Sequence, residues 1–99
     1  VRKESFAGTG FLKNKPPRIT NASKSIVARV NEPVLLFVKA VDDDNDPLIY
    51  TWDFGLFDKY QATASNLRTF TEPGIKAVKV TISDGHYQVV LPMNVNVVE

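Results

Sequence analysis

The chain has 99 residues, of which 43% are hydrophobic, and its 12 basic and 11 acidic side chains give a formal net charge of +1. This length accommodates one domain with a single hydrophobic core. The balanced charge argues against a dedicated nucleic-acid-binding protein, and the apolar content argues against a disordered chain. No apolar run approaches the roughly 18 residues that span a membrane, so we expect a globular domain that does not insert into one.

Cysteine is absent, and His86 is the only histidine. The lack of cysteine excludes disulfides, thiolate metal ligands and thiol nucleophiles. A single imidazole leaves little material for a Ser-His-Asp triad or a zinc site. We therefore predict a protein that is not an enzyme, and we expect His86 to be an exposed residue of the turn that begins at Asp84-Gly85.

Residues 1–17 are predicted to be a linker or a flexible N-terminal segment, because they hold scattered glycines, paired prolines and isolated aromatics without a sustained period. From Arg18 onward, short β-rich runs alternate with turn residues about every ten positions. We place the domain boundary at this change, so that residues 18–99 form the folded unit.

The first half of the domain contains three predicted strands. Residues 18–21 and 25–30 form a first strand that is split in the middle, and residues 34–41 are apolar on both faces, as in a central strand. In residues 48–54 large apolar side chains alternate with polar ones, so Trp52 is expected in the core. Asp53 lies on the opposite face, where its carboxylate is expected to accept backbone N–H groups of the following turn.

The middle of the domain carries weaker signals. Residues 59–64 and 66–71 are weak strand candidates, and Glu72-Pro73-Gly74 predicts a turn after them.

The last two strands are clearer. Residues 77–83 and 88–97 alternate on either side of Asp84-Gly85, a pair favoured in tight hairpins. Pro92 indicates that part of the last strand lies at an edge or a bulge. About seven antiparallel strands in this length predict an all-β, two-sheet sandwich.

Three segments together carry a family resemblance: Asp42-Asp43-Asp44-Asn45-Asp46-Pro47-Leu48, Tyr50-Thr51-Trp52-Asp53-Phe54-Gly55, and Glu72-Pro73-Gly74 ahead of the Asp84-Gly85 hairpin. They resemble the polycystic-kidney-disease repeat, or PKD domain, an immunoglobulin-like β-sandwich whose hallmark is Trp-Asp-Phe-Gly. The family usually continues as Gly-Asp-Gly where this chain has Gly55-Leu56-Phe57, and it tends to carry a tyrosine where this chain has Lys76. These departures alter one tight turn and remove one expected corner hydrogen bond.

The aspartates of residues 42–46 repel one another unless water or a cation separates them, and Ca²⁺ suits carboxylate, amide and carbonyl oxygens. Resemblance to some bacterial members of the family implies a Ca²⁺ site formed by Asp42, Asp44 and Asp84, with Asn14 or Asn21 as additional candidates. A solvated acidic loop without an ion is the alternative. No other cofactor is expected.

The resemblance, together with the lack of a placed nucleophile, base or metal triad, predicts a non-catalytic extracellular or cell-surface module. Such a module would be a spacer or an adhesion and protein-recognition domain of a larger protein. Its partners would be a protein or polysaccharide ligand and the neighbouring domains of the same chain.

Aromatic residues of the altered turn are the candidates for contact with a partner. Phe57 and Tyr60, beside Leu56, form either an exposed patch or a cover over the sandwich edge. The alternative function, an accessory carbohydrate- or fibre-binding domain of a secreted hydrolase, requires Phe57, Tyr60 and Tyr87 to form one exposed row. Asn21-Ala22-Ser23 also matches the glycosylation sequon.

Overall fold

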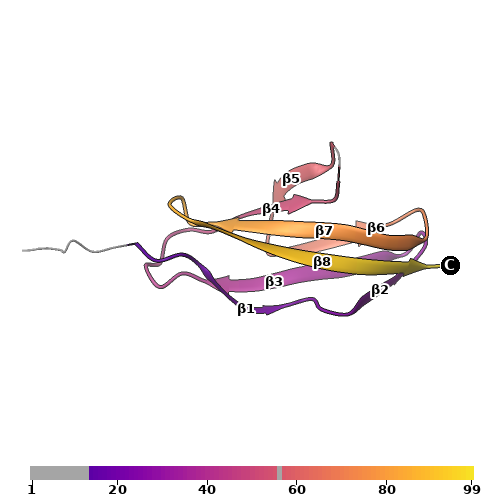
Figure 1. Ribbon diagram of the computed structural model, residues 1–99, viewed down its shortest axis with the longest axis horizontal. Helices are drawn as coiled ribbons and strands as arrows, with labels where there is room; N and C mark the ends of the chain where they lie inside the picture. The colour runs from indigo at the N-terminus through magenta and orange to yellow at the C-terminus, as the bar shows by residue number, and fades with distance from the viewer. Residues whose placement is uncertain (1–13, 56) are drawn as a thin grey trace, which may run out of the picture.

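Two β-sheets packed face to face form the protein in a computed structural model that describes residues 14–55 and 57–99 (Figure 1). The three-stranded sheet has the order β1-β3-β6, and the five-stranded sheet has the order β2-β8-β7-β4-β5. The strands are β1 (Arg18–Ala22), β2 (Ile26–Arg29), β3 (Pro33–Val41), β4 (Ile49–Asp53), β5 (Lys59–Ala62), β6 (Ser65–Thr69), β7 (Gly74–Ser83) and β8 (Gln88–Val98). Within these described ranges there is no helix, and thus no helix with the length and apolarity to cross a membrane. The all-β, two-sheet prediction is confirmed.

The predicted split of the first strand is a change of sheet. At Ser23 the backbone N–H donates to the Phe37 carbonyl at 3.0 Å, while the Ser23 hydroxyl accepts from the Phe37 N–H at 2.9 Å. These contacts end the antiparallel pairing of β1 with β3, and the chain then crosses to β8. There β2 pairs in parallel with residues Val95–Val98, whereas the other strand pairs are antiparallel. The split therefore produces eight strands rather than about seven.

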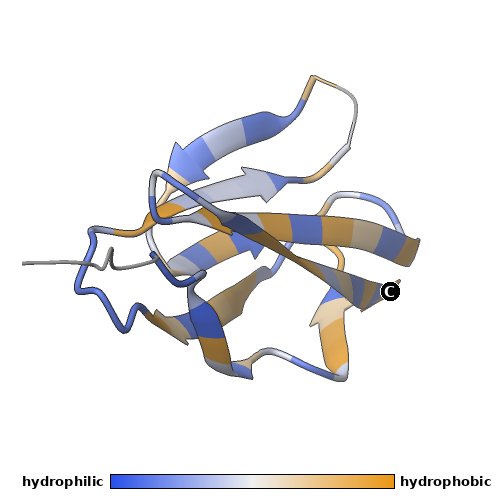
Figure 2. Cartoon of the chain, turned by 60° about the vertical axis from the view of Figure 1, so that its left-hand side comes forward, coloured by the Kyte–Doolittle hydropathy of each residue, from blue (hydrophilic) through white to orange (hydrophobic). Residues whose placement is uncertain are grey.

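Alternating side chains of both sheets build the core. Seven large side chains are almost completely excluded from solvent: Leu36, Val38, Trp52, Val80, Ile82, Val95 and Val97. The alternation is visible as orange and blue bands along β7 and β8 (Figure 2). The indole N–H of Trp52 donates to the Thr63 carbonyl at 2.8 Å, so its polar atom is satisfied inside the core. The predicted core position of Trp52 is confirmed.

In the part of the chain that the structure describes, one edge of β8 is open along the first half of the strand. β8 pairs with β7 from Gln88 to Val97, but β2 joins its other side only from Val95 onward. Pro92 lies in the half where, among the described residues, β7 is the sole neighbour. A missing N–H is tolerated at such an edge, so the placement of Pro92 agrees with the prediction.

The two weakly predicted strands close one side of the sandwich. β5 is the edge strand beside β4, and β6 is the edge strand beside β3, so a short link carries the chain from one sheet to the other. Among the described residues, each of these two strands pairs with a neighbour on one side only.

Residues just ahead of the predicted boundary at Arg18 contact the domain. The Asn14 amide donates to the Asp84 carboxylate at 3.2 Å, and the Lys15 backbone N–H donates to Asp44 at 2.7 Å. Pro17 is buried. The remainder of the predicted linker, residues 1–13, lies outside the described residues.

Candidate functional site

The acidic loop between β3 and β4 has a defined turn. The Asp42 carbonyl accepts from the Asn45 N–H at 3.0 Å, and the Asp42 carboxylate accepts from the Asp44 N–H at 3.0 Å. Asn45 has a φ of 58°, in the left-handed region that asparagine adopts more readily than bulkier residues do. The loop therefore folds back on itself and brings its carboxylates together.

Three carboxylates of this loop converge. Asp42, Asp44 and Asp46 each place one oxygen within 4.8 Å of the others. The Oδ2 atoms of Asp42 and Asp46 are shielded from solvent and have no hydrogen-bond partner among the described residues. Oxygen ligands in this arrangement are of the kind that Ca²⁺ takes. Of the predicted ligands, the structure brings Asp42 and Asp44 together, and it adds Asp46.

Asp43 points away from this group and pairs with β1. The guanidinium of Arg18 lies 2.9 Å from the Asp43 Oδ1 atom, and a second hydrogen bond joins the same side chains at 3.3 Å. The hydrogen bond from Arg18 is the main cause that lowers the pKa of Asp43 below its usual range. Both side chains are well exposed, so this pair contributes little to stability.

Asp84, the third predicted ligand, holds the β7–β8 turn. Its Oδ1 atom accepts from the backbone N–H groups of His86 at 2.8 Å and Tyr87 at 2.6 Å, and its Oδ2 atom accepts from Asn14. Burial of the carboxylate opposes its ionisation, but the hydrogen bonds from Tyr87 and His86 outweigh this effect and lower the pKa of Asp84. Asp84 is thus a turn residue outside the group of three carboxylates. His86 is exposed in this turn, as predicted.

The N-terminal segment joins the two acidic features. Asn14 contacts Asp84 while the adjacent Lys15 contacts Asp44, so the acidic loop and the β7–β8 turn lie at the same end of the sandwich. Asn21, the other additional candidate, pairs with Lys39 further along β1, and its Oδ1 atom accepts from the Ala22 N–H at 2.9 Å. Asn21 is therefore not part of the carboxylate group.

A second cluster closes the side of the sandwich between β5 and β6. The Arg68 guanidinium lies 3.9 Å from the centre of the Phe54 ring and forms an ion pair with Asp58. The Tyr60 ring stacks on Phe54 with ring centres 5.8 Å apart, and its hydroxyl accepts from the Asn66 amide at 3.0 Å. The hydrogen bond from Arg68 is the main cause that lowers the pKa of Asp58. These contacts give Tyr60 a structural role over the sandwich edge.

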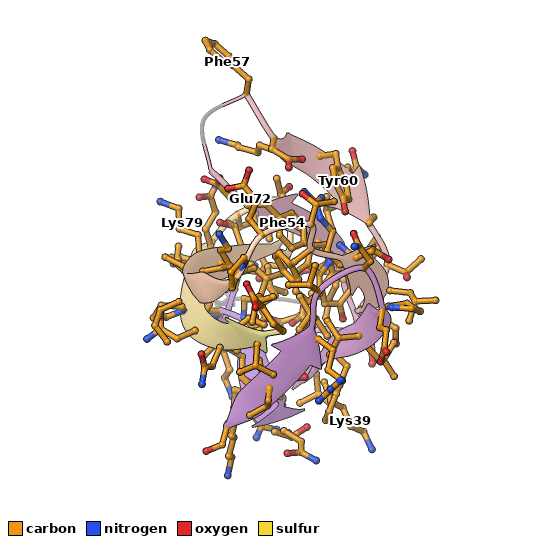
Figure 3. The ribbon with its side chains drawn as sticks, turned by 90° about the vertical axis from the view of Figure 1, so that its right-hand side faces the viewer. Lys39, Phe54, Phe57, Tyr60, Glu72 and Lys79 are labelled. Atoms are coloured by element: carbon orange, nitrogen blue, oxygen red, sulfur yellow. The ribbon has the colours of Figure 1, made fainter. Side chains whose placement is uncertain are left out.

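Phe57 behaves differently from Tyr60. It lies at the tip of the β4–β5 hairpin with 98% of its surface exposed, whereas Tyr60 is 37% exposed. Figure 3 shows Phe57 projecting away from the body of the sandwich, while Tyr60 and Phe54 lie closer to it. The structure thus separates the two residues predicted to bind a partner. Leu56 is outside the described residues.

The exposed aromatic row required by the carbohydrate-binding alternative is not formed. Tyr60 pairs directly with Trp52, so its side chain is on the core-facing side of β5. Tyr87 follows the end of β7, and Phe57 follows the end of β4, which runs antiparallel to β7. β4 ends beside Lys79, in the middle of β7, so Phe57 and Tyr87 are separated along the sheet and do not form one row.

Asp53 supports the β4–β5 hairpin as predicted. Its Oδ1 atom accepts from the Gly55 N–H at 3.0 Å, and its Oδ2 atom lies 3.9 Å from the Lys79 ammonium. A concavity of about 680 Å³ lies beside this hairpin on the outer face of the five-stranded sheet, and its lining includes Phe57, Lys59, Ala77 and Pro92. The volume is within the range of about 300–1,000 Å³ that is typical of ligand sites.

A family model described as the PKD domain matches residues 14–92. The chain belongs to the PKD domain family. Domains of this family are typically non-catalytic modules of larger proteins and are commonly extracellular. No curated protein matches the chain.

Solved structures share the fold of this PKD domain. The PKD domain of an M14-like peptidase from Thermoplasmatales archaeon SCGC AB-540-F20 has a TM-score of 0.68 at 16% identity, with 88% of this chain and 100% of that chain covered. A chain from the titin M10–obscurin-like 1 Ig mutant complex has a TM-score of 0.65 at 14% identity, covering 88% of this chain and 97% of that one. These TM-scores show a common fold, and the immunoglobulin-like assignment is confirmed.

The sequence pattern did not predict the roles of two residues of this PKD domain, Asp46 and Arg68. Asp46 was visible within the acidic loop, but the turn that directs it toward Asp42 and Asp44 depends on hydrogen bonds that residue order alone does not reveal. Arg68 carried no signal, because its position over Phe54 requires β6 to lie in the opposite sheet from β4.

Proposed function

We propose that this PKD domain is a non-catalytic extracellular or cell-surface module that acts as a spacer and recognition domain within a larger protein. The observation that carries the proposal is the position of the two ends of the domain. Asn14 is hydrogen-bonded to Asp84 at the β7–β8 turn. From this turn, β8 runs along the sheet to the other end of the sandwich (Figure 1). At about 3.3 Å per residue, a strand from Gln88 to Val98 spans roughly 33 Å.

Domains attached at opposite ends of a sandwich lie in a line, and such a module sets a fixed distance between its neighbours. The titratable side chains of the described residues support this role rather than catalysis. Asp53, Asp58 and Asp84 each accept hydrogen bonds within their own turn or ion pair. Asp84 accepts from the backbone N–H of His86, whereas a catalytic triad requires the carboxylate to orient the imidazole ring of the general base.

The proposal is tested by placing the chain between two compact reporter domains and measuring small-angle X-ray scattering. We expect a distance distribution with a separate long-distance maximum, because the reporters are held apart by the length of the sandwich. A single compact maximum would contradict the spacer role. Turnover of ester, peptide or glycoside substrates that disappears in His86→Ala would contradict the non-catalytic role.

We further propose that Ca²⁺ binds at the end of the domain where the chain enters. The support is the pair of shielded, unpartnered oxygens of Asp42 and Asp46 next to the Asp44 carboxylate in the described part of the chain. Asp84 would contribute by fixing the neighbouring turn and Asn14. An ion at this point would stiffen the junction with a preceding domain.

This site predicts a calcium-specific rise in melting temperature. At a concentration 100-fold above Kd, binding to the folded state adds about 2.7 kcal/mol, or several degrees for a domain of this size. The comparison is Ca²⁺ against Na⁺ at matched ionic strength, since screening alone would also stabilise the loop. The rise should vanish in Asp44→Asn and persist in Asp43→Asn, because Asp43 pairs with Arg18 outside the group. Equal melting curves in both salts would contradict the Ca²⁺ site and support the alternative of a solvated acidic loop.

A further inference from the structure

The tip of the β4–β5 hairpin has a backbone conformation that its residue does not favour. The Gly55 carbonyl accepts from the Asp58 N–H at 3.1 Å, and the Asp58 carbonyl accepts from the Phe54 N–H at 2.8 Å. These bonds close a tight turn in which Phe57 has a φ of 63°. Left-handed backbone is unusual for a bulky side chain, and the other non-glycine residues with positive φ in the described ranges are asparagines.

The Phe57 side chain does not contribute to the packing of the fold. Phe57 is 98% exposed, so it buries almost no apolar surface in return for its strained backbone. Glycine or asparagine would suit this turn position better. Backbone strain clusters at functional sites, and aromatic residues, including phenylalanine, are enriched in protein interfaces.

The surface beside Phe57 is concave and carries a positive charge. The concavity is lined by Ala77, Pro92 and Asn94 from β7 and β8, with Lys59 and Lys79 on its walls. Asp53 lies near Lys79 and also accepts from Gly55. Among the described residues, no carboxylate lies within ion-pair distance of Lys59, so the hairpin has a cation available for a ligand.

We propose that Phe57 and the concave sheet face beside it form a docking site for a partner polypeptide that presents an apolar side chain next to a carboxylate. Phe57, Ala77 and Pro92 contact the apolar side chain, and Lys59 pairs with the carboxylate. The proposal rests on the recognition role proposed above and specifies its partner. The charge favours a polypeptide over an anionic membrane, because membrane binding by electrostatics uses clusters of about four to eight basic residues.

The test selects peptides from a displayed library of random 12-residue sequences on the whole chain and measures the affinity of selected peptides by fluorescence anisotropy. We expect enrichment of sequences with Asp or Glu beside an aliphatic or aromatic residue. Phe57→Asn, which keeps a residue suited to left-handed backbone, should weaken binding at least about tenfold, as loss of a central interface aromatic does. Lys59→Glu should also weaken it, whereas Leu67→Asn, an exposed position on the other sheet, should not.

The melting temperature separates docking from packing. Phe57→Asn should melt at the same temperature as the parent or higher, and a lower value would assign Phe57 to the fold and overturn the proposal. Failure to enrich any peptide, equal affinity for Phe57→Asn, or binding confined to phosphatidylserine-containing vesicles would overturn it as well. Because the scattering experiment does not depend on Phe57, a negative peptide result with separated reporters would remove the docking site and leave the spacer role standing.

Discussion

At the scale of single residues, Trp52 connects the core to the turn beyond β5. Its ring is fully buried, its N–H donates to the Thr63 carbonyl, and its ring centre lies 6.3 Å from that of Phe54. Phe54 in turn contacts Arg68, so the core extends without a break to the charged cluster at the sandwich edge. Trp52 therefore packs in the core between the two sheets and, through Phe54, also supports the cluster at the sandwich edge.

Replacement of Trp52 by alanine should lower the free energy of unfolding by about 3–5 kcal/mol, because the lost side chain leaves a cavity between two packed sheets. Urea denaturation followed by circular dichroism measures the change. Trp52→Phe is the comparison, since it keeps most of the apolar volume but leaves the Thr63 carbonyl without its donor. A midpoint for Trp52→Ala equal to that of the parent would disprove the core role.

At the scale of elements, local pattern predicts strands better than it predicts their sheets. The alternation of β7 and β8 and the Asp84-Gly85 turn specify a hairpin that the structure contains. The parallel pairing of β2 with β8 was not predictable in this way, because it depends on where Ser23 ends the contact of β1 with β3. The same limit applies to the acidic loop, in which residue types indicated carboxylate ligands but hydrogen bonds decide which ones converge.

The β7–β8 turn predicts a pH dependence of stability. The pKa of Asp84 is lowered in the folded state, so the carboxylate stabilises the fold above its unfolded pKa of about 4 and loses this effect as the pH falls through the folded value. Asp84→Asn should therefore be less stable than the parent at pH 7, and the difference should shrink below pH about 4.

Urea midpoints of both proteins at neutral and acidic pH measure this difference. Glu72→Gln, an exposed acid in the turn before β7, is the matched control and should follow the parent at both values. A gap between the parent and Asp84→Asn that stays constant down to strongly acidic pH would show that the carboxylate charge does not hold the turn.

At the scale of the whole molecule, the sheet topology supports the proposed spacer role through its resistance to force. The chain enters beside the β7–β8 turn and leaves at the far end of β8 (Figure 1). Force applied at these two ends pulls β2 and β8 in opposite directions along a parallel pair, so the hydrogen bonds between Ile26–Arg29 and Val95–Val98 are loaded together. β5, in contrast, is an edge strand whose neighbour in the sheet, among the described residues, is β4.

Single-molecule force spectroscopy tests the spacer role most directly, and the absence of native cysteine allows handles to be attached at chosen positions. Pulling from residue 14 and residue 99 should unfold the domain in one step at a higher force than pulling from Lys59→Cys and residue 99, which peels β5 from β4 first. Equal forces in the two geometries, or gradual extension at low force when the two ends are pulled, would contradict the proposed role of this PKD domain as a spacer.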